Sequence, residues 1–285
     1  MSYFILVKIP NGDIEVLRKA TEKEKNWYNG LSNRLKEYWD NANRFDRVDK
    51  SYSELILATE SKGKILDVEE MVKYRSANFL YSFRECIDHW ETYINRKYGK
   101  SSNYYKKYKT LTSKVYDEYD EYKITYFLRN YQHVDDAVHF VNYVNGKVRP
   151  YIDRDIVLKE KKLKGDIRTA IKSRSKIIDL LPMFEIAKNE FGSVHVKLIF
   201  YTVTPELESQ VEEALDFKNS ISKNMMDSVI LGDFVDSAGN IIEPNNQSFN
   251  NIWLNDFRFS LNYIEIPWGT CNLIKRFKGT DYKNI

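Results

Sequence analysis

The feature of this sequence that most constrains its fold is a pair of long amphipathic segments separated by a short stretch around Gly99. In the first segment, over 67–98, apolar residues recur every three or four positions, at Leu80, Phe83, Ile87, Trp90 and Ile94. That spacing is typical of a helix with one buried face, and Gly99 marks its end. A similar pattern follows over 102–134. We therefore expect two long helices that pair antiparallel.

Strand-like patterns flank these helices. Residues 3–9 and 13–17 are expected to be strands joined at Asn11-Gly12, a dipeptide that is typical of a hairpin turn. Residues 137–152 repeat the arrangement around a second Asn-Gly pair. The last part of the chain, from Ser228, contains the strand-like stretches "SVILGDFVDSAGNIIE" and "RFSLNYIEI". The sequence therefore predicts an α+β protein with a helical centre and smaller β-containing segments at both ends.

Further helices are expected over 21–45, 163–173, 205–220 and from Asp179 onward. The first opens with Thr21 and Glu24, which have the spacing of a capping box. The stretch "SELILAT", 53–59, is compatible with either a short strand or a turn of buried helix. We expect three parts: an N-terminal hairpin and helix over 1–62, a helical core with an inserted hairpin over 63–200, and a β-rich C-terminal part over 201–285.

Composition narrows the possible functions. The formal net charge is only +3, from 44 basic and 41 acidic residues, so any contact with nucleic acid must rest on local patches. Two cysteines, Cys86 and Cys271, make neither a disulfide framework nor a zinc site and favour a reducing cytoplasm. No run is long and apolar enough to span a membrane. Scattered histidines and the lack of a glycine-rich phosphate loop predict neither a metal site nor a cofactor.

The stretch "TYFLRNYQHV", 125–134, carries the strongest candidate for chemistry. On a continuing helix, Arg129 and His133 would lie on one face, one turn apart. A histidine can take the proton from an RNA 2′-hydroxyl near neutral pH, and an arginine can bind the phosphate that this oxygen attacks. Asn130 could bind the same phosphate or hold the histidine tautomer. The alternative is an ordinary polar end of a core helix.

Residues 75–133 resemble HEPN-like bacterial proteins, an all-helical family whose RNase members carry an Arg-x(4–6)-His signature, often with Asn after the Arg. The matching stretches are "RSANFLYSFRECIDHWETYINRKYG" and "YDEYDEYKITYFLRNYQH", and the similarity extends over "YIDRDIVLKE" and "SKIIDLLPMFEIA". The resemblance implies a helical bundle, a homodimer with a composite cleft, and metal-independent RNA cleavage by Arg129, Asn130 and His133. It also implies a role in phage defence or as a toxin.

The interval between Arg129 and His133 holds three residues, whereas the family's signature has four to six. With strict family spacing the histidine position would be occupied by Val134, and the site would be inactive. His139 could be a substitute, but nine residues separate it from Arg129 and it lies in an expected strand. A non-catalytic module that binds RNA or a partner protein is therefore the alternative function.

Arg84 and His89 lie on the first long helix. One interpretation places either of them beside Arg129 as an additional phosphate contact. The other pairs Arg84 with Asp88 one turn away and leaves His89 packed or solvated.

The segment "RKYGKSSNYYKKYK", 96–109, interleaves cations with tyrosine rings, which suits single-stranded RNA. Its candidate RNA-binding residues are Lys97, Tyr104, Tyr105, Lys106 and Lys107. The alternative is a solvated interhelical loop. A second basic run, over 159–176, lacks aromatic residues and is interpreted as a solvated face, with phosphate steering as the alternative.

Overall fold

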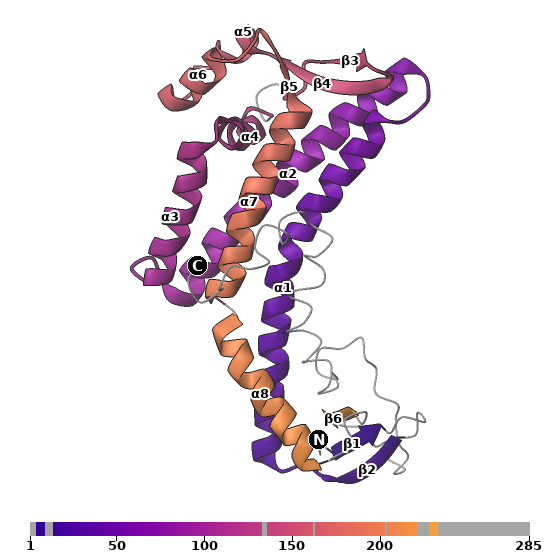
Figure 1. Ribbon diagram of the computed structural model, residues 1–285, viewed down its shortest axis with the longest axis vertical. Coiled ribbons are helices and arrows are strands. Elements are labelled where there is room, and N and C mark those ends of the chain that lie inside the picture. The colour runs from indigo at the N-terminus through magenta and orange to yellow at the C-terminus, as the bar shows by residue number, and fades with distance from the viewer. Residues whose placement is uncertain are drawn as a thin grey trace. The chain divides into compact units, whose positions relative to one another are not determined.

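Figure 1 shows the computed structural model, which describes residues 4–8, 14–132, 136–161, 163–202, 204–221 and 228–232. The protein is α+β: it is mostly helical and has two small antiparallel sheets of three strands each. The chain forms two compact units, 1–41 together with 199–285, and 42–198. The expected three-part division of the chain stays a prediction. Within the described ranges, no helix has the length and apolar character needed to cross a membrane.

The first unit contains a sheet of order β2-β1-β6, built from β1 (Phe4–Lys8), β2 (Ile14–Lys19) and β6 (Ser228–Gly232). The strands β1 and β2 confirm the expected N-terminal pairing, while Asn11-Gly12 lies outside the described residues. The start of the predicted C-terminal β region is confirmed by β6, which pairs antiparallel with β1. The rest of that region also lies outside the described residues.

Helix α1 spans Glu22–Thr59, so the expected helix over 21–45 is longer than predicted and "SELILAT" is helical. Its capping box is confirmed. The Thr21 backbone N–H donates to the Glu24 carboxylate at 2.8 Å, and the Glu24 backbone N–H donates to Thr21 Oγ1 at 3.2 Å. Helix α8 (Thr204–Ile221) lies close to the first part of α1, where the rings of Trp27 and Phe217 are 4.9 Å apart.

The second unit contains α2 (Ile65–Tyr98), α3 (Asn103–Glu118) and α4 (Asp120–Tyr131). The prediction of one continuous helix over 102–134 is wrong, because the backbone at Tyr119 is extended, with φ −123° and ψ 106°. Helix α3 runs antiparallel to α2, as expected, since Tyr105 donates to Glu91 and Tyr108 to the Ile87 carbonyl one turn earlier. Helix α4 contacts α2 through the rings of Tyr122 and Phe83. Helix α2 ends at Gly99, whose φ of +83° favours glycine.

The second sheet follows α4 in the sequence, lies at the top of Figure 1 and has the strand order β3-β4-β5. The predicted hairpin is confirmed: β3 (Phe140–Val144) and β4 (Lys147–Asp153) meet at Asn145 and Gly146. Both turn residues have positive φ, as a two-residue type I′ hairpin turn requires. The short helices α5 (Arg154–Val157) and α6 (Gly165–Lys172) then lead to β5 (Ile177–Asp179) and to α7 (Leu180–Thr202).

An aromatic core joins α2 to α7. Ring centroids of Phe79 and Phe184 are 4.8 Å apart, and those of Phe83 and Phe191 are 5.8 Å apart. All four side chains are fully buried. Each such ring removes a large apolar area from water, so these contacts hold the two helices together and fix the rotation of α2 about its own axis.

A buried hydrogen bond also joins the two helices across this core. The indole Nε1–H of Trp90 donates to Nδ1 of His195 on α7 at 2.8 Å, and His195 also stacks on Phe45 of α1 at 5.1 Å. Both partners of the hydrogen bond are fully buried. Losing either partner would leave the other with an unsatisfied polar group in the core.

A double-mutant cycle tests this hydrogen bond. We expect Trp90→Phe and His195→Leu, measured by urea unfolding singly and together, to be non-additive by about 1 kcal/mol or more, because either change alone removes the pair. Additivity within about 0.3–0.5 kcal/mol would mean that the two groups contribute independently.

The capping box gives a prediction about pH. The hydrogen bond from Arg18 to Glu24, reinforced by those from Thr21, lowers the pKa of Glu24 from 4.5 to about 2. Because the folded-state pKa is lowered, the contribution of Glu24 to stability is complete above pH 4.5 and is lost as the pH falls through about 2. NMR titration of the side-chain carboxyl should show this low pKa, and Arg18→Ala should raise it. A wild-type pKa near 4.5 would contradict the assignment.

Candidate functional site

Arg129 and Asn130 lie in the last turn of α4. The two side chains contact each other, with Arg129 Nη1 donating to Asn130 Oδ1 at 3.4 Å. The guanidinium also lies 5.6 Å from the ring of Tyr81, which α2 presents opposite it. Arg129 Nε is buried and donates to no side chain or carbonyl of the described part of the chain. A buried guanidinium donor of this kind favours an acceptor such as a phosphate oxygen.

His133 lies outside the described residues, so its pairing with Arg129 stays a prediction. Helix α4 ends at Tyr131, and Gln132 is its C-cap. The expectation that the helix continues through His133 also stays a prediction, because the described residues of this segment end at Gln132.

Arg84 lies on the face of α2 that meets α4. Its guanidinium is 3.7 Å from the ring centroid of Tyr126, a cation–π contact at short range. Its Nε donates to Asp88 at 3.0 Å, so the pairing expected one turn along the helix is present. Like Arg129 Nε, Arg84 Nη1 is buried and has no hydrogen-bond partner among the described residues. Because Tyr126 and Asn130 are one turn apart on α4, Arg84 lies near the predicted site.

His89 lies beside Glu85 on its own helix, with Nε2 3.6 Å from the carboxylate. Its side chain is 44% exposed, which agrees with the solvated alternative. Within the described part of the chain, His89 makes no hydrogen bond, ion pair or ring contact with Arg129.

The basic and aromatic residues around the α2–α3 turn contact one another. The rings of Tyr98 and Tyr104 stack with centroids 4.0 Å apart, and the Lys97 ammonium lies 5.3 Å from the Tyr98 ring. Lys106 is exposed and Lys107 is half-buried on α3. From Asn103 onward the segment is helical and not a loop. The Tyr98 ring already covers one face of the Tyr104 ring.

A cavity of about 410 Å³ opens between α2, α3, α4 and the segment that leads into α6. This volume falls within the range of small-molecule sites, about 300–1,000 Å³. Among its lining residues is one predicted catalytic residue, Asn130. The rings that line it are Tyr108, Tyr116, Tyr122, Tyr126, Phe127 and Tyr131.

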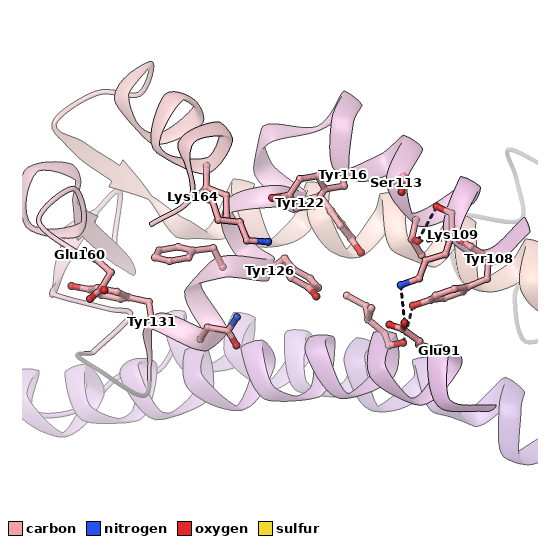
Figure 2. A pocket seen from close by; sticks show the side chains of 15 residues that line it. Glu91, Tyr108, Lys109, Ser113, Tyr116, Tyr122, Tyr126, Tyr131, Glu160 and Lys164 are labelled. Atoms are coloured by element: carbon pink, nitrogen blue, oxygen red, sulfur yellow. Dashed lines mark hydrogen bonds and ion pairs between the residues drawn. The ribbon is translucent and has the colours of Figure 1, made fainter. Parts of the chain in front are cut away.

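Figure 2 shows the distribution of charge in the cavity. Glu91 and Lys109 lie at one end, Glu160 at the other, and the Lys164 ammonium points toward the middle, near Tyr126. Glu91 accepts hydrogen bonds from Tyr105 and Lys109, each at 2.7 Å. Burial alone would raise the pKa of Glu91, but these two hydrogen bonds outweigh it and hold the pKa below its ordinary value. Glu91 is thus a paired anion, and Tyr105 has a role in joining α3 to α2.

The sequence contains a pattern that could have identified this cavity. Tyr108, Thr112 and Tyr116 recur every fourth residue on α3, as do Tyr122, Tyr126 and Asn130 on α4. Spacing of four places side chains on one face of a helix. Lys164 was not singled out within the basic run because only the fold brings it to α4. Other basic residues of that run are structural: Arg168 donates to the carbonyl oxygens of Leu158 and Glu160.

Arg84→Lys should destabilise the protein. The substitution keeps the charge but removes the planar guanidinium that stacks on Tyr126 and donates to Asp88, so we expect a loss of about 1 kcal/mol in the free energy of unfolding. Arg47→Lys on α1 is the matched control, since Arg47 is 73% exposed and its ion pair with Glu85 is loose at 3.8 Å. Equal urea midpoints for the two variants would show that stacking on Tyr126 does not contribute.

The described residues hold no group of three His, Cys, Asp or Glu side chains that could bind a metal ion. The candidate site instead consists of the buried guanidinium donors of Arg84 and Arg129, the Asn130 amide and the ring-lined cavity between α2, α3 and α4. A comparison with protein-family models, curated proteins and solved structures finds no significant match.

Proposed function

We propose that this chain is a HEPN-like endoribonuclease that cuts RNA without a metal ion, as a dimer, with Arg129 on the scissile phosphate and His133 transferring the proton. The observation that carries the proposal is the buried Nε of Arg129, a guanidinium donor with no acceptor among the described residues. A phosphate oxygen is the acceptor that matches a guanidinium best in charge and geometry. The resemblance of 75–133 to HEPN-like proteins supplies the rest of the proposal.

The reaction follows from these groups. His133 takes the proton from the 2′-hydroxyl, and the resulting oxygen attacks the adjacent phosphorus. The bond between phosphorus and the 5′-oxygen breaks, and the leaving oxygen takes a proton from the imidazolium or from the second copy's histidine. The products are a 2′,3′-cyclic phosphate and a 5′-hydroxyl. Arg129 stabilises the extra negative charge of the pentacoordinate transition state.

Cleavage in excess EDTA tests this function directly. We expect RNA fragments with 2′,3′-cyclic phosphate ends, a loss of about 10²–10⁴-fold in rate for His133→Ala and of about 10²–10³-fold for Arg129→Ala. Arg47→Ala, which removes an exposed arginine of α1, should cut at the wild-type rate. Circular dichroism must be unchanged in each variant. Undiminished cleavage by His133→Ala, or loss of wild-type cleavage when EDTA is added, would contradict the proposal.

One observation favours a non-catalytic alternative. The described helix α4 ends at Tyr131, so it does not by itself fix a one-turn relation between Arg129 and His133. In this alternative, the protein binds RNA through Arg129 and does not cut it. Fluorescence anisotropy with a labelled single-stranded RNA would then show weaker binding for Arg129→Ala, unchanged binding for His133→Ala and no cleavage by any variant.

A further inference from the structure

The cavity beside Asn130 has features that cleavage chemistry alone does not require. Its inner wall is formed by fully buried rings, including Tyr108 and Tyr122. Two half-buried rings, Tyr116 and Tyr126, stand at 89° to each other with centroids 6.3 Å apart. The two rings contact each other edge to face, and the pair forms part of the aromatic wall against which a planar group could lie. Arg84 holds Tyr126 in place from α2.

Such a lining suits a nucleobase that has left its stack. Bases stack on tyrosine rings and guanidinium planes irrespective of their sequence, because every base has a π-face. The cavity volume of about 410 Å³ has room for a ligand of this class. The Asn130 amide at the rim offers a donor and an acceptor to the edge of a base.

The charges favour an anion attached to that planar group. Glu91 is neutralised by Lys109. Lys164 is exposed at the N-cap of α6, its ammonium points into the cavity in Figure 2, and it forms no ion pair with any described residue. An ammonium in this position is a natural contact for a phosphate.

Asn130 connects the cavity to the proposed catalytic residue. Its side chain lines the cavity, and its Oδ1 accepts the hydrogen bond from Arg129. A nucleotide that contacts Asn130 in the cavity would therefore lie close to Arg129, whose guanidinium is assigned to the scissile phosphate.

We propose that this cavity binds one unstacked RNA base, with a phosphate of the same nucleotide on Lys164, and so selects the nucleotide beside the bond that is cut. The assignment rests on the proposed function for its biological substrate, but the binding itself does not need cleavage. It follows that the protein acts on unpaired RNA, since a base inside a duplex cannot enter the cavity.

Calorimetry with mononucleotides separates this inference from the nuclease activity, because AMP, CMP, GMP and UMP contain no bond that the enzyme could cut. Ribose 5-phosphate is the ligand control, as it has the phosphate without the base. We expect the full-length wild-type protein to bind at least one of the four nucleotides at least tenfold more tightly than ribose 5-phosphate. Tyr126→Leu should weaken that binding by about 5- to 150-fold, the range expected from loss of one ring–base stack.

Lys164→Ala tests the same site without touching the core and should weaken nucleotide binding about tenfold, whereas Lys161→Ala, also exposed on the segment before α6, should leave it unchanged. Absence of nucleotide binding, equal binding of ribose 5-phosphate, or equal effects of the two lysine variants would each overturn the inference. RNA cleavage in EDTA without nucleotide binding would refute the nucleotide-binding role of the cavity but leave the nuclease proposal intact. Nucleotide binding without RNA cleavage would support the cavity assignment and refute the nuclease proposal.

Discussion

The candidate site depends on how α2 is divided into a buried face and a polar face. Phe79, Phe83 and Trp90 pack against α7 and thereby fix the rotation of α2 about its axis. Once that rotation is fixed, the neighbouring stripe must turn toward α3 and α4. Arg84 then meets Tyr126, and Glu91 meets Lys109. The geometry of the cavity is therefore a consequence of aromatic packing on the adjacent face of the same helix.

The low net charge is compatible with the proposed RNA-binding site. A few cations held beside rings in a partly dry surrounding interact with phosphate more strongly than many cations spread in water. Arg84 and Arg129 each carry a buried donor, and Lys164 adds a third cation from the N-cap of α6. The local arrangement, rather than the total of +3, determines what the surface can bind.

Much of the fold follows from local sequence rules. The three- and four-residue spacing over 67–98 predicts α2, the capping box predicts the start of α1, and the Asn145-Gly146 pair predicts the β3–β4 turn. Each of these depends on contacts within a few residues.

The break at Tyr119 depends instead on distant partners. No glycine or proline marks it. Arg174, which follows α6, forms an ion pair with Glu121 at 2.8 Å, and Tyr116 donates to Asp166 of α6 at 2.8 Å. The two helices are thus held at an angle by residues some 50 positions further along the chain. The place of Lys164 in the cavity has the same origin, so neither could be predicted from periodicity.

The most direct test of the whole account is a crystal structure of the His133→Ala protein with a short single-stranded RNA. The account predicts one base inside the cavity with its plane against Tyr126, and the adjoining phosphate within hydrogen-bond distance of the Arg129 guanidinium. A complex in which the cavity holds no base and the backbone runs away from Arg129 would contradict it.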